Sequence, residues 1–241
     1  MNTLVLAAGK STRIQSVTGG YPKPLLSIRG ETIIGRNLKW LAAEGITKVW
    51  INLHYRPEEI QRTLKGGSQF GVQIHYILES EILGTAGAVK NIAANWEEPY
   101  FVVYGDSLVQ FDLGGMVKKH QENQPLATIA LFDQKTHQHT SAAGGRIEVD
   151  AGFRILDFKE RSTASYSGLV NAGVYLVEPS LVQEIPSNTF YDFGLDLFPK
   201  ILASKKYLLG HVIDGYCLGL DTPESYAEAL HLIEIGKVVL S

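Results

Sequence analysis

The sequence has very little cysteine and no long apolar run. Cys217 is the only cysteine among 241 residues, so no disulfide can form within the chain and a reducing compartment is expected. No stretch approaches the roughly 20 apolar residues that span a bilayer. The apolar run at residues 4–8 is too short for a secretory signal and has no basic segment before it. We therefore expect a cytoplasmic protein that has no membrane partner.

The chain also lacks a strong net charge. It has 22 Lys and Arg against 25 Asp and Glu, a formal charge of −3, which gives no reason to expect nucleic acid as a partner. An anionic ligand must then be held by a few local cations and backbone N–H groups. Because no repeat, low-complexity tract or linker interrupts the sequence, we predict one domain over residues 1–241, with halves at 1–113 and 114–241.

In the first half, apolar strand patterns alternate with helical patterns. The strand patterns lie at residues 3–7, 48–53, 72–78 and 99–104, and the helical ones at 33–44, 57–64 and 85–96. Strands that alternate with helices predict βαβ units, a parallel sheet and an α/β fold. In such a sheet, ligands bind at the carboxyl ends of the strands.

The second half is richer in strand patterns. Strands are expected at 126–133, 145–150, 155–160, 171–177, 207–213 and 216–220, and helices at 116–123, 195–204 and 224–236. The segments around Gly152 have the pattern of a hairpin.

A loop of small residues, LAAGKSTR at 6–13, follows the first strand. Small residues let the backbone approach an anion, and successive N–H groups in a tight turn can bind phosphate. It is not a P-loop, because that motif needs a glycine where Leu4 stands, and the dinucleotide fingerprint is missing as well. An ordinary turn with Lys10 and Arg13 in solvent would explain this segment equally well.

Lys23 stands between two prolines in the run PKPLL. The rings restrict the backbone on both sides of it, so the lysine is expected on a stiff stalk. A fixed cation beside a phosphate suits phosphoryl transfer, which depends on positioning and charge neutralisation. A surface lysine in a proline-rich turn is the alternative.

A third segment, ESEILGTAGA, joins a strand to a helix. Its small residues permit close approach of a flat ring or a ribose, and Glu79 offers two acceptor oxygens at the strand end. Simple capping of the helix is the alternative.

A fourth segment, Gly105-Asp106, ends an apolar strand. A carboxylate there suits Mg²⁺, which takes one or two protein carboxylates and completes its shell with phosphates and water. A helix cap or an Asx-turn is the alternative.

Taken in order, LAAGKSTR, PKPLL, ESEILGTAGA, GD, FKER and NAGVY resemble the sugar-1-phosphate nucleotidylyltransferases, or NDP-sugar pyrophosphorylases. The resemblance runs from Asn2 to about His231. It implies a Rossmann-like mixed, mostly parallel sheet flanked by helices, with a smaller β-rich sugar-binding part. It also implies an enzyme that takes an NTP, a sugar 1-phosphate and Mg²⁺, and it leaves a homo-oligomer open. With no β-helix or acyltransferase segment in the sequence, we expect no fused second activity.

The resemblance assigns roles by position. Arg13 and Lys23 would be catalytic and would neutralise the moving charge, and Asp106 and Asp221 would bind the metal. The nucleotide-binding residues would be Ala7, Ala8, Gly9, Lys10, Ser11, Thr12, Glu79, Gly84 and Thr85. The residues that bind the sugar phosphate would be Gly145, Glu160, Arg161 and Asn171.

Two positions depart from the family pattern. Many relatives have an aspartate where this chain has Gly219, and Asp221 lies two residues further on, on the same side of an extended strand. Ser11 stands where many relatives have glycine. Gly219 motivates one alternative, a non-catalytic sensor of nucleotides or sugars, against which the presence of Lys23 and Asp106 counts.

The carboxylate of Glu79 suggests the base. Guanine presents two neighbouring donors, N1–H and the 2-amino group, that one carboxylate can accept, so GTP is expected first and UTP second. A cytidylyltransferase acting on phosphocholine or another alcohol phosphate is the remaining alternative, although the pair Glu160 and Asn171 favours a polyol.

Several other polar residues need no function. His137 and His139 lie in a polar loop where no third metal ligand is evident. Asp192 and Asp196, in the run YDFGLD, are explained equally well by a capped helix start, and Cys217 by a place in the core.

Overall fold

The computed structural model describes residues 1–140, 145–160 and 168–240. In its first half the strands are β1 (Thr3–Leu6), β2 (Ser27–Ile28), β3 (Glu31–Thr32), β4 (Lys48–Leu53), β5 (Gln73–Leu78), β6 (Tyr100–Tyr104) and β7 (Ser107–Gln110). The helices there are α1 (Gln15–Thr18), α2 (Ile33–Ala43), α3 (Pro57–Leu64) and α4 (Gly84–Ala93).

The second half follows with more strands. They are β8 (Ala127–Asp133), β9 (Arg146–Val149), β10 (Ile155–Lys159), β11 (Leu169–Val177), β12 (Leu208–Val212) and β13 (Tyr216–Gly219). The helices are α5 (Leu113–Asn123), α6 (Phe198–Ala203), which a π-helical turn at Phe193–Leu197 precedes, and α7 (Pro223–Glu234).

One nine-stranded sheet runs through both halves in the order β10-β9-β11-β6-β1-β4-β5, with β8 beside β11 and β12 beside β8. Strands β10 and β11 run opposite to the other seven. The expected α/β fold, a mixed and mostly parallel sheet, is therefore present. The chain passes from β1 to β4 on one side and returns to β6 on the other, so the order of the strands switches at β1.

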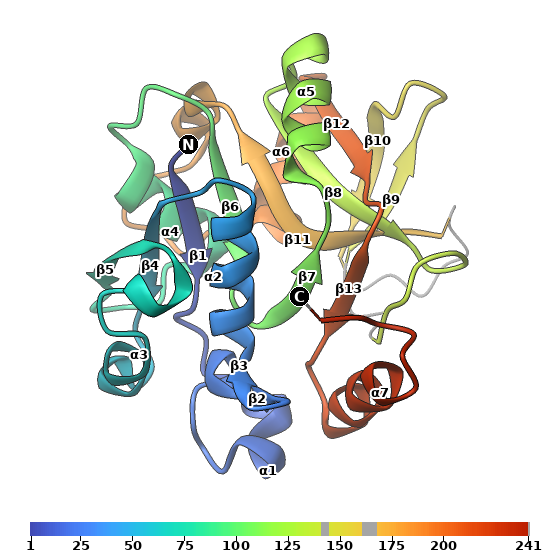
Figure 1. Cartoon of the computed structure of the whole chain (residues 1–241). Coiled ribbons are helices and arrows are strands. Elements are labelled where there is room, and N and C mark those ends of the chain that lie inside the picture. The colour runs from blue at the N-terminus through green and yellow to red at the C-terminus, as the bar shows by residue number, and fades with distance from the viewer. Residues whose placement is uncertain (141–144, 161–167, 241) are drawn as a thin grey trace.

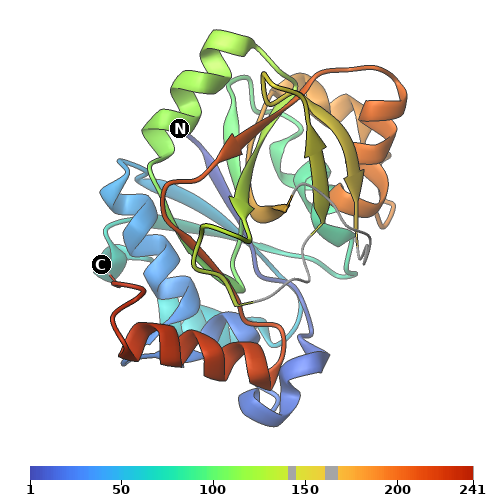
Figure 2. The same ribbon diagram turned by 90° about the vertical axis from the view of Figure 1, so that its right-hand side faces the viewer.

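Helices cover both faces of this sheet, as Figures 1 and 2 show. Side chains alternate along β1, so Val5 points into a core with α2, α3 and α5, whereas Leu4 and Leu6 point into a core with α4 and α6. A third cluster joins α7 to β7 and β13. Within the described part of the chain, no helix is both long and apolar enough to cross a membrane.

The sequence predicts most of these elements, and β4 and α3 lie at the expected residues. The short strand β7 was not expected, because Gly105-Asp106 reads as the end of a strand. It pairs only with β13, more than a hundred residues further on, in a separate antiparallel ribbon. Helix α5 begins earlier than expected because Asp112 caps it, accepting from Gly115 N at 3.1 Å.

Helix α2 holds the backbone of β7 and the residues after it. Asn37 Nδ2 donates to the carbonyl of Ser107 (2.8 Å) and Trp40 Nε1 to that of Phe111 (3.0 Å). One turn further on, the Glu44 carboxylate accepts from Leu113 N at 3.0 Å. Asn37, Trp40 and the C-cap residue Glu44 lie on one side of α2, so the segment that follows Asp106 is fixed by side chains as well as by strand pairing.

Candidate active site

Two cavities open at the carboxyl ends of the central strands, where the strand order switches. The first has a volume of about 250 Å³. It is lined by Leu6, Ala7, Ala8, Gly9, Ser11, Pro24, Asn52, Glu79, Ile82, Gly84, Thr85, Tyr104, Asp106, Phe190 and Asp192. Most of the residues assigned to the nucleotide from sequence thus lie together, whereas Lys10 and Thr12 are exposed and do not belong to this lining.

The second cavity, of about 210 Å³, adjoins the first. It is lined by Arg13, Tyr104, Asp106, Ser107, Phe132, Glu160, Asn171, Ala172, Gly173, Cys217, Gly219 and Asp221. Tyr104 and Asp106 line both cavities, so a ligand in one can meet a ligand in the other at the end of β6.

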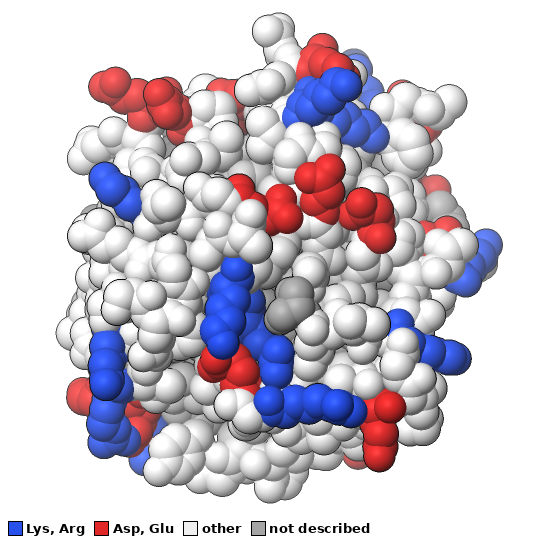
Figure 3. Space-filling view, viewed as in Figure 1, with Lys and Arg blue, Asp and Glu red and all other residues white. Residues whose placement is uncertain are grey.

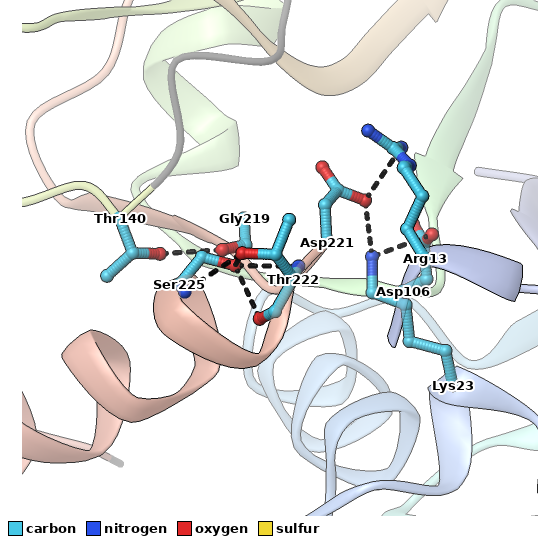
Figure 4. A network of polar contacts seen from close by, with 8 residues as sticks. All are labelled: Arg13, Lys23, Asp106, Thr140, Gly219, Asp221, Thr222 and Ser225. Atoms are coloured by element: carbon cyan, nitrogen blue, oxygen red, sulfur yellow. Dashed lines mark hydrogen bonds and ion pairs between the residues drawn. The ribbon is translucent and has the colours of Figure 1, made fainter. Parts of the chain in front are cut away.

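A cluster of charges lies at this junction (Figure 4). Lys23 Nζ donates to Asp106 Oδ2 at 3.0 Å and to Asp221 Oδ1 at 2.8 Å. Arg13 Nη2 reaches the same Asp221 oxygen at 3.3 Å. Only 2% of the Lys23 side chain is exposed, compared with 66% for Arg13. Lys23 is therefore a fixed, buried cation, and Arg13 is a solvated one.

The protonated form of Lys23 is stabilised in this cluster. Burial alone would lower the pKa of its ammonium group, but the charges and hydrogen bonds of Asp106 and Asp221 outweigh burial and raise the pKa. Lys23 is therefore positively charged in the folded protein at neutral pH.

Asp221 is placed by contacts around the end of β13. Gly219 pairs with Ser107, which directly follows Asp106, so the antiparallel ribbon brings the two carboxylates to the same end. Thr140 Oγ1 donates to the Gly219 carbonyl at 2.7 Å, and Thr222 begins α7 with a capping box (Figure 4). Asp221 lies beyond the end of β13 rather than within an extended strand, and its carboxylate meets that of Asp106 across Lys23.

The loop after β1 is held at one end and open at the other. Ala7 N donates to Asn52 Oδ1 at 2.9 Å, whereas the N–H groups of Gly9 and Lys10 donate to no described residue. Ser11 has a left-handed backbone (φ 51°, ψ 44°), which explains why glycine suits this position. A turn whose N–H groups are free, and which lies beside the cations Arg13 and Lys23, can bind phosphate.

Glu79 is buried at the far end of the first cavity, with 7% of its surface exposed. Its Oε1 accepts from Asn52 Nδ2 at 3.0 Å. Burial raises the pKa of its carboxyl group, although the Asn52 amide, the backbone of Leu83 and the nearby His54 lower it in part. Its Oε2 is also buried and makes no hydrogen bond of ordinary geometry to the described residues. A buried acceptor such as this oxygen is expected to receive a hydrogen bond from a ligand.

The start of α4 requires small residues because other backbone segments of the chain pack against it. A Cβ on Gly84 would lie 2.5 Å from the carbonyl oxygen of Tyr191, and one on Gly87 would lie 2.8 Å from that of Thr189. The chain's own backbone therefore makes the close approach that we expected from a ring or ribose. Gly84 and Thr85 still line the cavity beside it.

Of the residues assigned to the sugar phosphate, Glu160 and Asn171 line the second cavity. Gly145 supports them instead, because its carbonyl accepts from Asn171 N at 3.0 Å and a Cβ there would lie 2.9 Å from the Glu160 carboxylate. Arg161 lies outside the described residues.

The residues to which no function was given have structural contacts. His137 Nε2 lies 2.6 Å from the Ile213 carbonyl, and His139 stacks on Phe132. Asp192 caps the helical turn at Phe193–Leu197, accepting from Gly194 N and Leu195 N. Burial, and to a lesser extent Asp221, raises the pKa of the Cys217 thiol to about 12, which keeps it unreactive at neutral pH.

A magnesium ion fits this set of donors only together with a substrate. Within the described ranges there is no group of three or more His, Cys, Asp or Glu that could hold a metal. Asp106 and Asp221 do converge on one point, and two carboxylates completed by phosphate oxygens and water satisfy Mg²⁺.

Sequence reasoning missed three residues of the first cavity's polar wall. Asn52 and Tyr104 are the final or near-final residues of β4 and β6, so their place at strand ends was a usable signal. From the sequence, Asp192 is explained as the cap of a helix. Its carboxylate accepts from Thr85 Oγ1 at 2.8 Å, in addition to its capping bonds.

The chain is similar to known proteins in both sequence and fold. The family model described as "Nucleotidyl transferase" matches residues 2–234. The UTP–glucose-1-phosphate uridylyltransferase of Synechocystis sp. is 34% identical over 85% of this chain, but the chain spans only 56% of that protein's length. The D-glycero-α-D-manno-heptose 1-phosphate guanylyltransferase of Aneurinibacillus thermoaerophilus is 28% identical over 95% of this chain and 96% of its own.

A solved structure shares the fold. HddC from Yersinia pseudotuberculosis, complexed with GMP-PN, superimposes with a TM-score of 0.80 at 23% identity, covering 96% of this chain and 99% of that one.

Proposed function

The chain belongs to the nucleotidyl transferase family, and we propose that it joins a sugar 1-phosphate to the nucleoside monophosphate part of an NTP, releasing pyrophosphate. One observation mainly supports this. A small-residue cavity and a polar cavity meet at Asp106, and Lys23 bridges that carboxylate to Asp221. Two anionic substrates could lie in the two cavities with their phosphates together at the charge cluster.

In the proposed reaction, a phosphate oxygen of the sugar phosphate attacks the α-phosphorus, and the bond to the bridging β-phosphate oxygen breaks. The free N–H groups after β1 would hold the triphosphate. Lys23, already fixed at the junction, would neutralise charge that grows on the α-phosphate, and exposed Arg13 would neutralise the leaving pyrophosphate. Glu160 and Asn171 would orient the sugar.

Asp106, assisted by Asp221, would hold Mg²⁺. When bound, the ion would offset the repulsion between the two anionic substrates. The two carboxylates are 36% and 24% exposed, so substrate phosphates and water could complete the metal shell.

For the base we propose guanine ahead of uracil. Relatives named for uridylyl and for guanylyl transfer both match, so the argument rests on Glu79. Its Oε2 is buried and accepts no hydrogen bond of ordinary geometry from the described residues, which suits a base edge with a donor. The two donors of guanine suit a carboxylate best. Glu79→Gln should reorder the four NTPs by kcat/KM. If the order stays the same, Glu79 does not read the base.

The function is tested by a matrix of four NTPs against several sugar 1-phosphates and phosphocholine, read by pyrophosphate release. We expect release with a sugar 1-phosphate and GTP. Release only with phosphocholine and CTP would replace this proposal with the alcohol-phosphate alternative. Nucleotide binding without release from any pair would support a sensor. A cytoplasmic location also stays a prediction from the sequence.

A further inference from the structure

A chain of hydrogen bonds crosses the wall between the two cavities. Asn171 Nδ2 donates to the Tyr175 hydroxyl at 2.7 Å, and that hydroxyl donates to the hydroxyl of Tyr104 at 3.2 Å. Tyr104 and Thr85 both line the first cavity. Thr85 Oγ1 donates to Asp192 Oδ2 at 2.8 Å. The chain therefore begins in the second cavity and ends in the first.

An irregularity in β11 makes this chain possible. The pairing of β11 with β8 shifts register between Asn171 and Tyr175, and Gly173 between them has a φ of +73°. In a regular strand, residues four apart lie about 13 Å from each other. Here Gly173 N donates to Asn171 Oδ1 at 2.9 Å, which folds Asn171 back toward Tyr175 and fixes which side of its amide donates.

The ring of Tyr104 is held independently of its hydroxyl. It packs edge-to-face on Tyr175, with centroids 5.7 Å apart at 82°. A Cβ on Gly173 would come 3.1 Å from its Cγ, so the backbone of β11 lies directly against the ring. Removing the hydroxyl should leave the wall in place and break only the hydrogen-bond chain.

We propose that Tyr104 is a positioning residue, whose hydroxyl sets the Asn171 side of the second cavity relative to the Thr85 side of the first. Ligands in the two cavities are thereby aligned with each other. The proposal rests on the proposed transfer reaction for its effect on rate, because alignment of two reactants governs such a step. Its effect on binding does not depend on catalysis.

Tyr104→Phe tests the proposal. We expect kcat to fall about tenfold, since misalignment affects the reacting geometry, while the Kd of each substrate alone, measured by titration calorimetry, changes less than about threefold. Tyr100→Phe is the matched control. Tyr100 is on the same strand and fully buried, and its hydroxyl has no partner among the described residues, so kcat should stay unchanged. Equal kcat in the two variants would overturn the proposal.

A second variant separates alignment from general loosening. Tyr175→Phe should lower kcat about as much as Tyr104→Phe does. The double variant should lower kcat no further than either single variant, because both substitutions break the same chain of hydrogen bonds. Losses that multiply to about a hundredfold would show two independent effects and reject the chain.

A binding measurement keeps the test meaningful if no transfer is found. In the unchanged protein, a sugar 1-phosphate should shift the Kd of a non-hydrolysable GTP analogue about fivefold, and Tyr104→Phe should reduce that shift toward none. Tyr100→Phe should retain it. No shift in the unchanged protein, or an equal shift in Tyr104→Phe, would refute Tyr104 whatever the reaction. Absence of pyrophosphate release from every pair would refute only the proposed function.

Discussion

The two cavities are similar in volume but are built in different ways. The first has mainly apolar walls of backbone and small side chains beside its polar wall of Asn52, Tyr104 and Asp192, and Glu79 is the buried carboxylate at its far end. The second is lined by charged and polar side chains, among them Arg13, Glu160 and Asp221. From this difference we expect shape and the buried Glu79 acceptor to select the ligand of the first cavity, and charge and hydrogen bonding to select that of the second. On the face seen in Figure 3, acidic and basic side chains form small separate groups among uncharged atoms.

Asp106 belongs to both cavities, so its replacement should have the largest effect. Asp106→Asn should abolish measurable turnover at every Mg²⁺ concentration, a fall of about a thousandfold or more. Pyrophosphate release during a Mg²⁺ titration measures this. Asp157→Asn, at an exposed hairpin ion pair with Lys159, is the control and should match the unchanged protein. Rescue of Asp106→Asn by high Mg²⁺ would contradict the prediction.

Lys23 lies between the cavities and should rank next. Lys23→Ala should lower kcat about a hundredfold and change ground-state binding less, because the lysine acts on charge that develops in the transition state. The fold should persist, since water can reach both carboxylates after truncation. Circular dichroism checks this point.

Two variants complete the test of Lys23. Lys23→Arg should rescue only in part, because a planar fork cannot replace a compact charge. Lys10→Ala removes an exposed lysine of the neighbouring loop and should cost little. If Lys10→Ala and Lys23→Ala lower kcat equally, the total positive charge near the site matters and the position of Lys23 does not.

Asp221 lines only the second cavity, and its effect should be confined to the metal. Asp221→Asn should raise the Mg²⁺ concentration for half-maximal rate about tenfold and leave the maximal rate within a fewfold. The same Mg²⁺ titration measures it. If this variant matches the unchanged protein throughout, one carboxylate suffices and Asp221 serves only the fold.

Ser11 lines only the first cavity, and its replacement should have the smallest effect. Ser11→Gly removes a serine with a left-handed backbone, whose strain costs about 1 kcal/mol. Thermal unfolding should therefore show that the protein gains at most that much stability. The greater freedom of glycine in the unfolded chain reduces the gain. Ser27→Gly, in a strand without positive φ, should destabilise instead. Equal destabilisation by both would show that Ser11 is not strained.

The sequence predicts where ligands meet this fold because polar residues at strand ends are visible one strand at a time. Glu79 and Asp106 are predicted in this way, and Lys23 is predicted by its place between two prolines. Their burial and pairing were not predictable, since the ribbon of β7 and β13 joins segments far apart in the chain. The place of Asp221 depends on that ribbon.

The wall between the cavities was less accessible to sequence reasoning. The run NAGVY marks Asn171, but the fold-back at Gly173 appears only when β11 pairs with β8. Tyr104 has the pattern of an ordinary apolar strand residue, because its hydrogen-bond partner Tyr175 comes from β11, some seventy residues further on.

The pairing of β6 with β11 has a consequence for how the chain folds. Residues 100–103 of β6 pair with residues 174–177 of β11, which the ribosome adds some seventy residues later. Until then the nascent first half carries β6 as an open edge, with a row of unpaired N–H and C=O groups and apolar side chains. We therefore expect residues 1–113 made alone to aggregate, and folding to be slow at the closure of this long-range pair. The two halves, each of which contributes residues to both cavities, are therefore one unit for assembly.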